Sequence, residues 1–146
     1  MLEFIWINGS ENIEPIIKLR YDVFCKEQGY PYMLEKDDLE SKSYHLGVYS
    51  DDRLIGCGRL APESADSFHL GRIALYPEYR GGGNGAKLVY ELLKKAKELG
   101  AKHATLDAQE HAVGFYKKLG FVKDGVRHED ENIPHIPMIK SFVFDN

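Results

Sequence analysis

The stretch "RIALYPEYRGGGNGAKLVYELLKK", residues 72–95, runs from an apolar segment through Pro77 into three consecutive glycines. Apolar residues then recur at helical spacing, which predicts an amphipathic helix from Gly83 to Leu99. Glycine loses more backbone freedom on folding than any other residue, so three glycines at a helix entrance need a reason. The stretch therefore indicates a strand, a tight turn and a helix in direct succession.

The glycine turn has two interpretations. The first N–H groups of a helix have no partner within the helix and carry partial positive charge, so they can bind an anion. Gly81, Gly82, Gly83 and Gly85 have no Cβ to keep a phosphate away, and Arg80 offers a charged contact. The same glycines can instead serve only to reverse the chain. The spacing disfavours both a nucleoside triphosphate loop and a dinucleotide-binding loop.

Outward from this stretch, strand-like and helix-like segments alternate irregularly along the chain. The order predicts an α/β chain with a mixed sheet, not a strictly alternating doubly wound one. The expected helices are one that is capped by Ser10 or Asn12 and ends near Lys26, the helix described above, and one over 110–119. The expected strands are 2–7, a hairpin of 44–50 and 53–62, then 67–76, 102–108, 121–130 and 135–145.

Length and composition predict one domain over residues 1–146. The net charge of −4, with both signs interspersed, argues against a nucleic-acid or membrane partner, since either needs a dense basic face. The first residues lack the basic region of a signal peptide, and no apolar run reaches membrane-spanning length. Cys25 and Cys57 have no metal-ligand spacing. We therefore expect a cytoplasmic protein without a metal site.

Four stretches together resemble one family. "RGGGNG" (80–85), with its lead-in strand, is similar to the R/Q-x-x-G-x-G/A loop of the GNAT family of N-acetyltransferases. "GFYKKLGF" (114–121) resembles that family's FYxKxGF motif. "VFCKEQGYPY" (23–32), and "DAQEHAVGFY" (107–116) with "NIPHIPM" (132–138), resemble its small ElaA/YjcF-like branch. The stretches occur in the family's order along nearly the whole chain.

The resemblance implies a fold and an activity. The fold is a mixed, mostly antiparallel sheet of about six to seven strands flanked by helices, with one parallel strand pair that splays apart. The activity is transfer of an acetyl group from acetyl-CoA, the cosubstrate, to a primary amine. The acceptor would be a small-molecule amine or an exposed amino group. A homodimer is one possible oligomeric state.

The same resemblance implies a site for the cosubstrate. Backbone groups of the strand before the glycine turn would pair with the pantetheine arm in the splayed gap, and the amides of the turn would hold the pyrophosphate. The implied residues are Ile73, Ala74, Leu75, Arg80, Gly81, Gly82, Gly83, Asn84, Gly85, Ala86 and Phe115.

Two residues are candidates for proton transfer. Tyr116 matches the family's tyrosine near the thioester sulfur, where it would act as general acid to the departing CoA thiolate. A phenol has a reference pKa of about 10, so it can donate a proton at neutral pH. His69 lies on the predicted central strand and has a side chain suited to base work. The alternatives are a core aromatic at 116 and an ordinary surface histidine at 69.

The acceptor side is predicted from the loop after the first helix and from the matched histidines. Glu27 and Gln28 lie in that loop, and His45 and His135 accompany the branch-like stretches. We expect these four side chains to bind the acceptor, although Glu27 can equally be a solvated carboxylate. At the level of function, an acyl-CoA-binding or regulatory module and a scaffold without a ligand stay open as alternatives.

Overall fold

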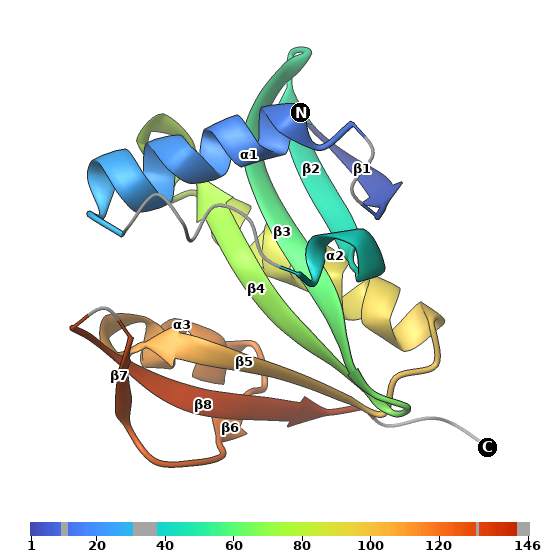
Figure 1. Cartoon of the computed structure of the whole chain (residues 1–146), viewed down its shortest axis with the longest axis vertical. Coiled ribbons are helices and arrows are strands. Elements are labelled where there is room, and N and C mark those ends of the chain that lie inside the picture. The colour runs from blue at the N-terminus through green and yellow to red at the C-terminus, as the bar shows by residue number, and fades with distance from the viewer. Residues whose placement is uncertain (10–11, 31–37, 131, 143–146) are drawn as a thin grey trace.

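The computed structural model describes residues 1–9, 12–30, 38–130 and 132–142 (Figure 1). Their strands form one sheet in the order β1-β2-β3-β4-β5-β8-β6, with β7 paired to β8. The strands are β1 (Leu2–Asn8), β2 (Tyr44–Ser50), β3 (Arg53–Ser64), β4 (Ser67–Leu75), β5 (His103–Gln109), β6 (Val122–Lys123), β7 (His128–Asp130) and β8 (Ile133–Ser141). The helices are α1 (Glu14–Arg20), continued by a π-helical segment over Tyr21–Glu27, then α2 (Asn84–Glu98) and α3 (Val113–Lys118).

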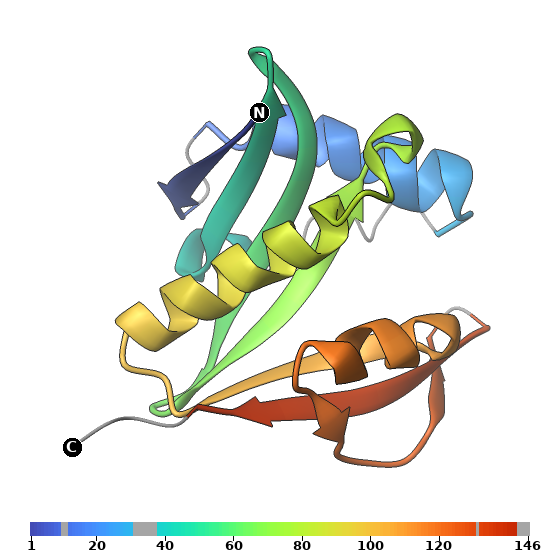
Figure 2. The ribbon, with the colours of Figure 1, turned by 180° about the vertical axis from the view of Figure 1, so that it is seen from behind.

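Helices cover both faces of the sheet. The views in Figures 1 and 2 show α1 on one face of β2–β4, and α2 and α3 on the opposite side. Gly58 on β3 lets α2 approach closely, because a Cβ at that position would lie 2.9 Å from Leu92 Cδ1. The predicted amphipathic helix is confirmed, with its apolar stripe in the main core: Leu88, Val89, Leu92, Leu93 and Ala96 are buried.

The sheet divides where β4 meets β5. These two strands pair in parallel only at Ser67–His69 with His103–Thr105, and beyond that they diverge into a V (Figure 1). β4 stays paired to β3, and β5 stays paired to β8 along its whole length. Each strand therefore leaves one edge of its backbone facing the gap. The expected splayed parallel pair is confirmed.

A β-bulge reshapes β4 within the gap. Arg59 pairs with Gly71 and Cys57 pairs with Ala74, so β4 has three residue steps where β3 has two. The extra residue falls at Arg72, whose φ of 52° lies in the left-handed region that non-glycine residues seldom adopt. A bulge bends the strand that contains it and increases its twist, which favours divergence from β5.

Two expectations differ from the structure in detail. The segment expected as one strand over 121–130 forms the short strands β6 and β7, so the sheet has eight strands. Five steps separate Lys123 from His128, but only three separate their partners Met138 and His135, so the chain must loop out between them. Helix α1 begins after Ile13 with no side-chain cap, so the expected cap at Asn12 is wrong; Ser10 lies outside the described residues.

A buried ionic cluster fastens α1 to the sheet. The Glu40 carboxylate accepts a hydrogen bond from Arg59 Nη1 at 2.8 Å and another from Arg20 Nη1. His45 lies beside it, with Nε2 2.9 Å from the Glu40 carbonyl oxygen. Burial lowers the pKa of His45. All four side chains are nearly or fully buried, so the Glu40 carboxylate meets two guanidinium groups that water cannot reach.

The cluster predicts a large loss of stability on neutralising Glu40. We expect Glu40→Gln to lower the free energy of unfolding by about 3–5 kcal/mol, because it removes the buried negative charge that accepts hydrogen bonds from both guanidinium groups. The matched control is Glu78→Gln, which breaks an exposed 3.8 Å pair with Arg53 and should change stability by about 0–1 kcal/mol. Equilibrium urea unfolding measures both. Equal losses in the two variants would contradict the role given to the buried carboxylate.

Candidate functional site

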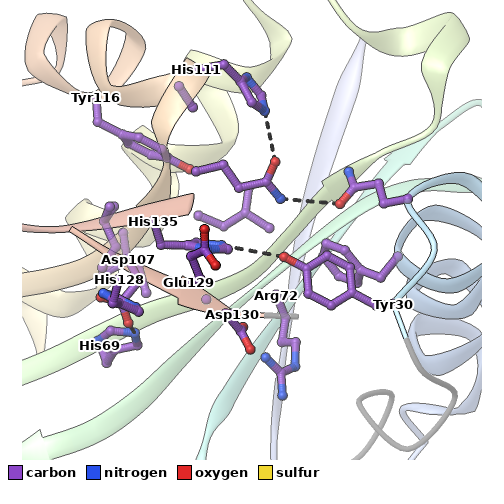
Figure 3. A pocket seen from close by; sticks show the side chains of 18 residues that line it. Tyr30, His69, Arg72, Asp107, His111, Tyr116, His128, Glu129, Asp130 and His135 are labelled. Atoms are coloured by element: carbon purple, nitrogen blue, oxygen red, sulfur yellow. Dashed lines mark hydrogen bonds and ion pairs between the residues drawn. The ribbon is translucent and has the colours of Figure 1, made fainter. Parts of the chain in front are cut away.

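A cavity of about 590 Å³ lies where β4 and β5 have diverged. Its walls are β4 from His69 to Ile73 and residues of β5, with β7, β8, α3 and the segment after α1 completing the lining. Figure 3 shows labelled side chains of these elements converging on one space. The splayed pair thus opens a cavity in the gap where the resemblance implies the pantetheine arm.

Tyr116 on α3 lines the cavity, and its hydroxyl points into it (Figure 3). Phe115 and Phe121 pack edge-on against its ring, with centroids 5.1 and 5.8 Å away. Burial raises the pKa of Tyr116 to about 12. The phenol is therefore protonated at neutral pH and can donate a proton to an anion in the cavity. Tyr116 is both packed against the core and directed at the cavity, so the two interpretations of this residue are compatible.

His69 also lines the cavity, at the last residue of β4 that pairs with β5. Its Nδ1 lies 2.8 Å from Thr105 Oγ1 and 3.3 Å from Glu63 Oε2. Its Nε2 lies 3.7 Å from Asp107 Oδ2. About one third of the side chain is exposed. His69 is therefore held on one nitrogen by polar neighbours and presents the other beside a cavity carboxylate.

Gln28 and His135, two of the four predicted acceptor residues, line the cavity. Gln28 Oε1 accepts a 3.3 Å hydrogen bond from Gln109 Nε2 across the gap. His135 is 7% exposed, with Nδ1 2.8 Å from the Ile133 carbonyl oxygen. Its Nε2 lies 3.5 Å from the Tyr30 hydroxyl. These two contacts connect the segment after α1 with β5 and β8 on the opposite side of the cavity.

Glu27, a third predicted acceptor residue, does not line the cavity. Its carboxylate receives hydrogen bonds of 2.6 and 2.7 Å from both terminal nitrogens of Arg80. The Arg80 Nε donates to the Leu75 carbonyl at 3.0 Å, so its guanidinium ties the end of β4 to the segment after α1. This bidentate pair lowers the pKa of Glu27 and raises the pKa of Arg80. The structure thus pairs Glu27, a predicted acceptor residue, with Arg80, a predicted cosubstrate residue.

His45, the fourth predicted acceptor residue, does not line the cavity either. It is fully buried in the ionic cluster with Glu40 and Arg20, so an acceptor molecule in the cavity cannot reach it. The sequence places His45 in a strand, but its neighbours in space come from other segments. Its role in this structure is to complete the packing between α1 and the sheet.

The glycine turn adopts the conformation that only glycine adopts readily. Gly81, Gly82 and Gly83 have φ of 88°, 61° and 84°, and no atom lies within 4 Å of a Cβ built on any of them. Backbone conformation, not crowding, therefore requires these glycines. Within the described chain their amides donate no hydrogen bond. Phe115 approaches the turn, since its Cζ would lie 3.5 Å from a Cβ on Gly85.

The strand before the turn presents its backbone to the gap. Ile73 lines the cavity, whereas Ala74 and Leu75 pair on their other side with Cys57 and Gly56 of β3. The turn itself lies beyond the cavity lining, at the open end of the V, where α2 begins. An elongated ligand with an anionic end would therefore fit with its chain between the strands and its anion at the turn.

Several cavity residues escaped sequence reasoning. Asp107 precedes Gln109 by two positions on β5, and both line the cavity, so the alternation of side chains along a strand could have grouped them on one wall. His128, Glu129 and Asp130 on β7 reach the cavity only because β7 pairs with β8, a long-range pairing that no local pattern indicates. Arg72 is the extra residue of the β4 bulge and also lines the cavity. Their charges make the lining predominantly acidic.

Two further observations concern metals and membranes. Among the described residues, no group of three or more His, Cys, Asp or Glu side chains is arranged to hold a metal ion. In the same part of the chain, every helix is too short or too polar to cross a bilayer.

Comparison with known proteins places this fold and site in a family. The model of the acetyltransferase (GNAT) domain matches residues 10–142. The chain is 36% identical over 133 residues to the uncharacterized N-acetyltransferase YjcF of Bacillus subtilis, covering 90% of this chain and 94% of that protein. A crystal structure of an acyl-CoA N-acyltransferase from Pseudomonas aeruginosa superposes with a TM-score of 0.87 at 27% identity, over 97% of this chain and all of the other. Escherichia coli ElaA gives 0.86 at 26%, with the same coverage.

The match covers the splayed strands, the glycine turn and Tyr116 alike. The resemblance inferred from the four sequence stretches is therefore confirmed. The chain belongs to the GNAT acetyltransferase family and is an acyltransferase with acetyl-CoA as its cosubstrate.

Proposed function

We propose that this protein transfers the acetyl group of acetyl-CoA directly to a primary amine, with Tyr116 as general acid and His69 as general base. The observation that carries the proposal is the Tyr116 hydroxyl, which points into the cavity from a site where burial raises its pKa to about 12. A proton donor is needed where the thiolate departs, and this phenol stays protonated at neutral pH. His69 lines the same cavity and supplies the second proton-transfer group.

The gap and the turn suit the cosubstrate. Pantetheine has amide groups that can bond to the backbone edges of β4 and β5 left open by the divergence of the two strands. The amides of Gly81, Gly82 and Gly83, which donate to no acceptor within the described chain, would hold the diphosphate together with those of Gly85 and Ala86 at the start of α2. The Asn84 amide lies 3.3 Å from the Gly81 carbonyl oxygen and would have to turn from it to join them. Coenzyme A supplies the thioester, and the chain orients it. Phe115 lies beside the turn and would contact the bound cosubstrate.

The proposed proton path uses one residue at each end of the reaction. A primary amine has a pKa of about 10 and is mostly protonated at neutral pH, so His69 must first take a proton from it. The amine nitrogen then forms a bond to the thioester carbonyl carbon, the bond from that carbon to sulfur breaks, and the nitrogen releases its second proton to solvent. Tyr116 gives its proton to the departing sulfur and is later reprotonated from solvent.

The charge of the cavity favours an amine acceptor. Asp107, Glu129 and Asp130 line it together, and Arg72 is the cation among the lining residues. An acidic lining attracts a protonated amine and disfavours an anionic acceptor. Gln28 on the segment after α1 and His135 on β8 add hydrogen-bonding groups from two sides of the cavity. A small-molecule amine and an exposed amino group on a larger partner both fit this charge.

Removing the Tyr116 hydroxyl tests the general acid. We expect Tyr116→Phe to lower kcat about 100-fold, because positioned proton transfer contributes about 10²–10⁴-fold to a rate. KM for acetyl-CoA should change little, since the ring remains in place. Thiol release with a panel of amines measures the effect, and Tyr90→Phe on the exposed face of α2 is the control. Unchanged turnover would refute the role of Tyr116, and tight CoA binding without thiol release in the wild type would favour a binding module.

Adding one methyl group to the glycine turn tests the diphosphate site. We expect Gly82→Ala to raise Kd for CoA about tenfold, or about 1.4 kcal/mol, because it strains the left-handed backbone and occupies the face that the diphosphate approaches. Binding of acetyl-pantetheine, which lacks the diphosphate, should be unaffected. The control is Gly100→Ala at the end of α2, which has a φ of 90° and equally open surroundings. Equal effects of Gly82→Ala on both ligands would contradict the assignment.

A further inference from the structure

Four side chains form a connected hydrogen-bond chain at the closed end of the V. Ser67 Oγ donates to Glu63 Oε1 at 2.9 Å. Thr105 Oγ1 lies 3.0 Å from both oxygens of the same carboxylate. His69 Nδ1 lies 2.8 Å from Thr105 Oγ1 and 3.3 Å from Glu63 Oε2. Glu63 is the penultimate residue of β3, Thr105 is on β5 and His69 is on β4, so these hydrogen bonds span the junction of the two halves of the sheet.

The direction of each hydrogen bond follows from the number of hydrogens available. A carboxylate only accepts, so the single hydroxyl hydrogen of Thr105 is donated to Glu63. The Thr105 oxygen can then only accept from His69, which requires a hydrogen on His69 Nδ1. The nearby Glu63 oxygen accepts from that same N–H or stabilises it. A neutral imidazole has one N–H, so Nε2 holds the lone pair.

We propose that Thr105 and Glu63 are positioning residues that fix the tautomer of His69, so that Nε2 is the atom that takes the proton from the acceptor amine. This inference rests on the proposed function for the use of that proton, but the tautomer itself is a property of the free protein. The residues act through His69 and touch neither substrate.

The surroundings of Nε2 suit the task. Asp107 Oδ2 lies 3.7 Å away, beyond a normal hydrogen bond, so it leaves the lone pair accessible. Once Nε2 has taken a proton, the imidazolium lies between Glu63 on the Nδ1 side and Asp107 on the Nε2 side. Both carboxylates then stabilise the positive charge. The same two carboxylates draw a cationic amine toward this end of the cavity.

The register of β4 and β5 fixes the positions of His69 and Thr105 relative to each other. His69 pairs with Thr105, the last parallel pair before β4 and β5 diverge. The backbone ladder therefore fixes the separation of these two side chains, while the next residues along both strands already face the cavity. The base is anchored at the last point where the two halves of the sheet are still joined.

Nuclear magnetic resonance of the ligand-free protein tests the tautomer directly. Long-range ¹H–¹⁵N correlation spectra at about pH 8, with His69 assigned from His69→Gln, should show a protonated Nδ1 and an unprotonated Nε2. Thr105→Val removes the hydroxyl at nearly constant shape and should transfer proton to Nε2 in a substantial fraction of molecules. Thr105→Ser, the matched control, keeps a hydroxyl and should preserve the wild-type pattern. A wild-type spectrum with the proton on Nε2, or a Thr105→Val spectrum like the wild type, would overturn the proposal.

Glu63→Ala provides a second variant on an exposed residue, should Thr105→Val fail to fold. It removes both carboxylate oxygens that accept from Thr105, which frees the threonine hydroxyl to donate to Nδ1 and shifts the proton to Nε2. An unchanged tautomer in this variant would also overturn the proposal.

Kinetics separates this inference from the proposed function. We expect Thr105→Val and Glu63→Ala to lower kcat about tenfold with KM for acetyl-CoA unchanged, and Thr105→Ser to stay within about twofold. If His69→Gln keeps full activity while the spectra show the expected tautomer, the base assignment fails and the positioning contact stands. If His69→Gln is inactive but neither variant moves the tautomer or kcat, the positioning role fails and the base assignment stands.

Discussion

The short parallel contact between β4 and β5 is the constraint on which the rest of the site depends. Only three residue pairs join these strands, and each strand then keeps its partner on the other side. A sheet normally satisfies its backbone N–H and C=O groups internally. Two adjacent strand edges without such partners can therefore form hydrogen bonds with the amide groups of a ligand. The cavity, the glycine turn at the open end and the histidine at the closed end all take their positions from this divergence.

Much of the fold could be predicted because its signals are local. The hairpin around Asp51 and Asp52, both with positive φ, and the apolar stripe of α2 follow from turn chemistry and periodicity. The glycines at 81–83 could be identified as a special turn because three glycines in succession suit a backbone with positive φ, which all three adopt. What failed was the division of 121–130 into two strands, since it is set by the pairing of both with β8.

The candidate site divides in the same way. Tyr116, His69 and Ile73 were found from motifs and strand position, and all three line the cavity. Glu27 and His45 were reasonable acceptor residues from sequence, but partners distant in the chain, Arg80 and Glu40, engage them elsewhere. Glu129 belongs to no motif, and Asp107 begins a matched stretch that gave it no role of its own. Their contribution comes from where the strands meet, which only the folded chain reveals.

The buried ionic cluster has a consequence for how the protein tolerates change. Arg20, Glu40 and Arg59 come from three separate segments, and each satisfies a charge that the others impose. A single replacement of Glu40 removes the acceptor that both guanidinium groups share, whereas a concerted exchange of all three for apolar side chains of similar volume removes the donors and the acceptor together. Evolutionary drift at these positions is therefore expected to be coupled: the members should be retained or lost together, even though none of them faces the cavity.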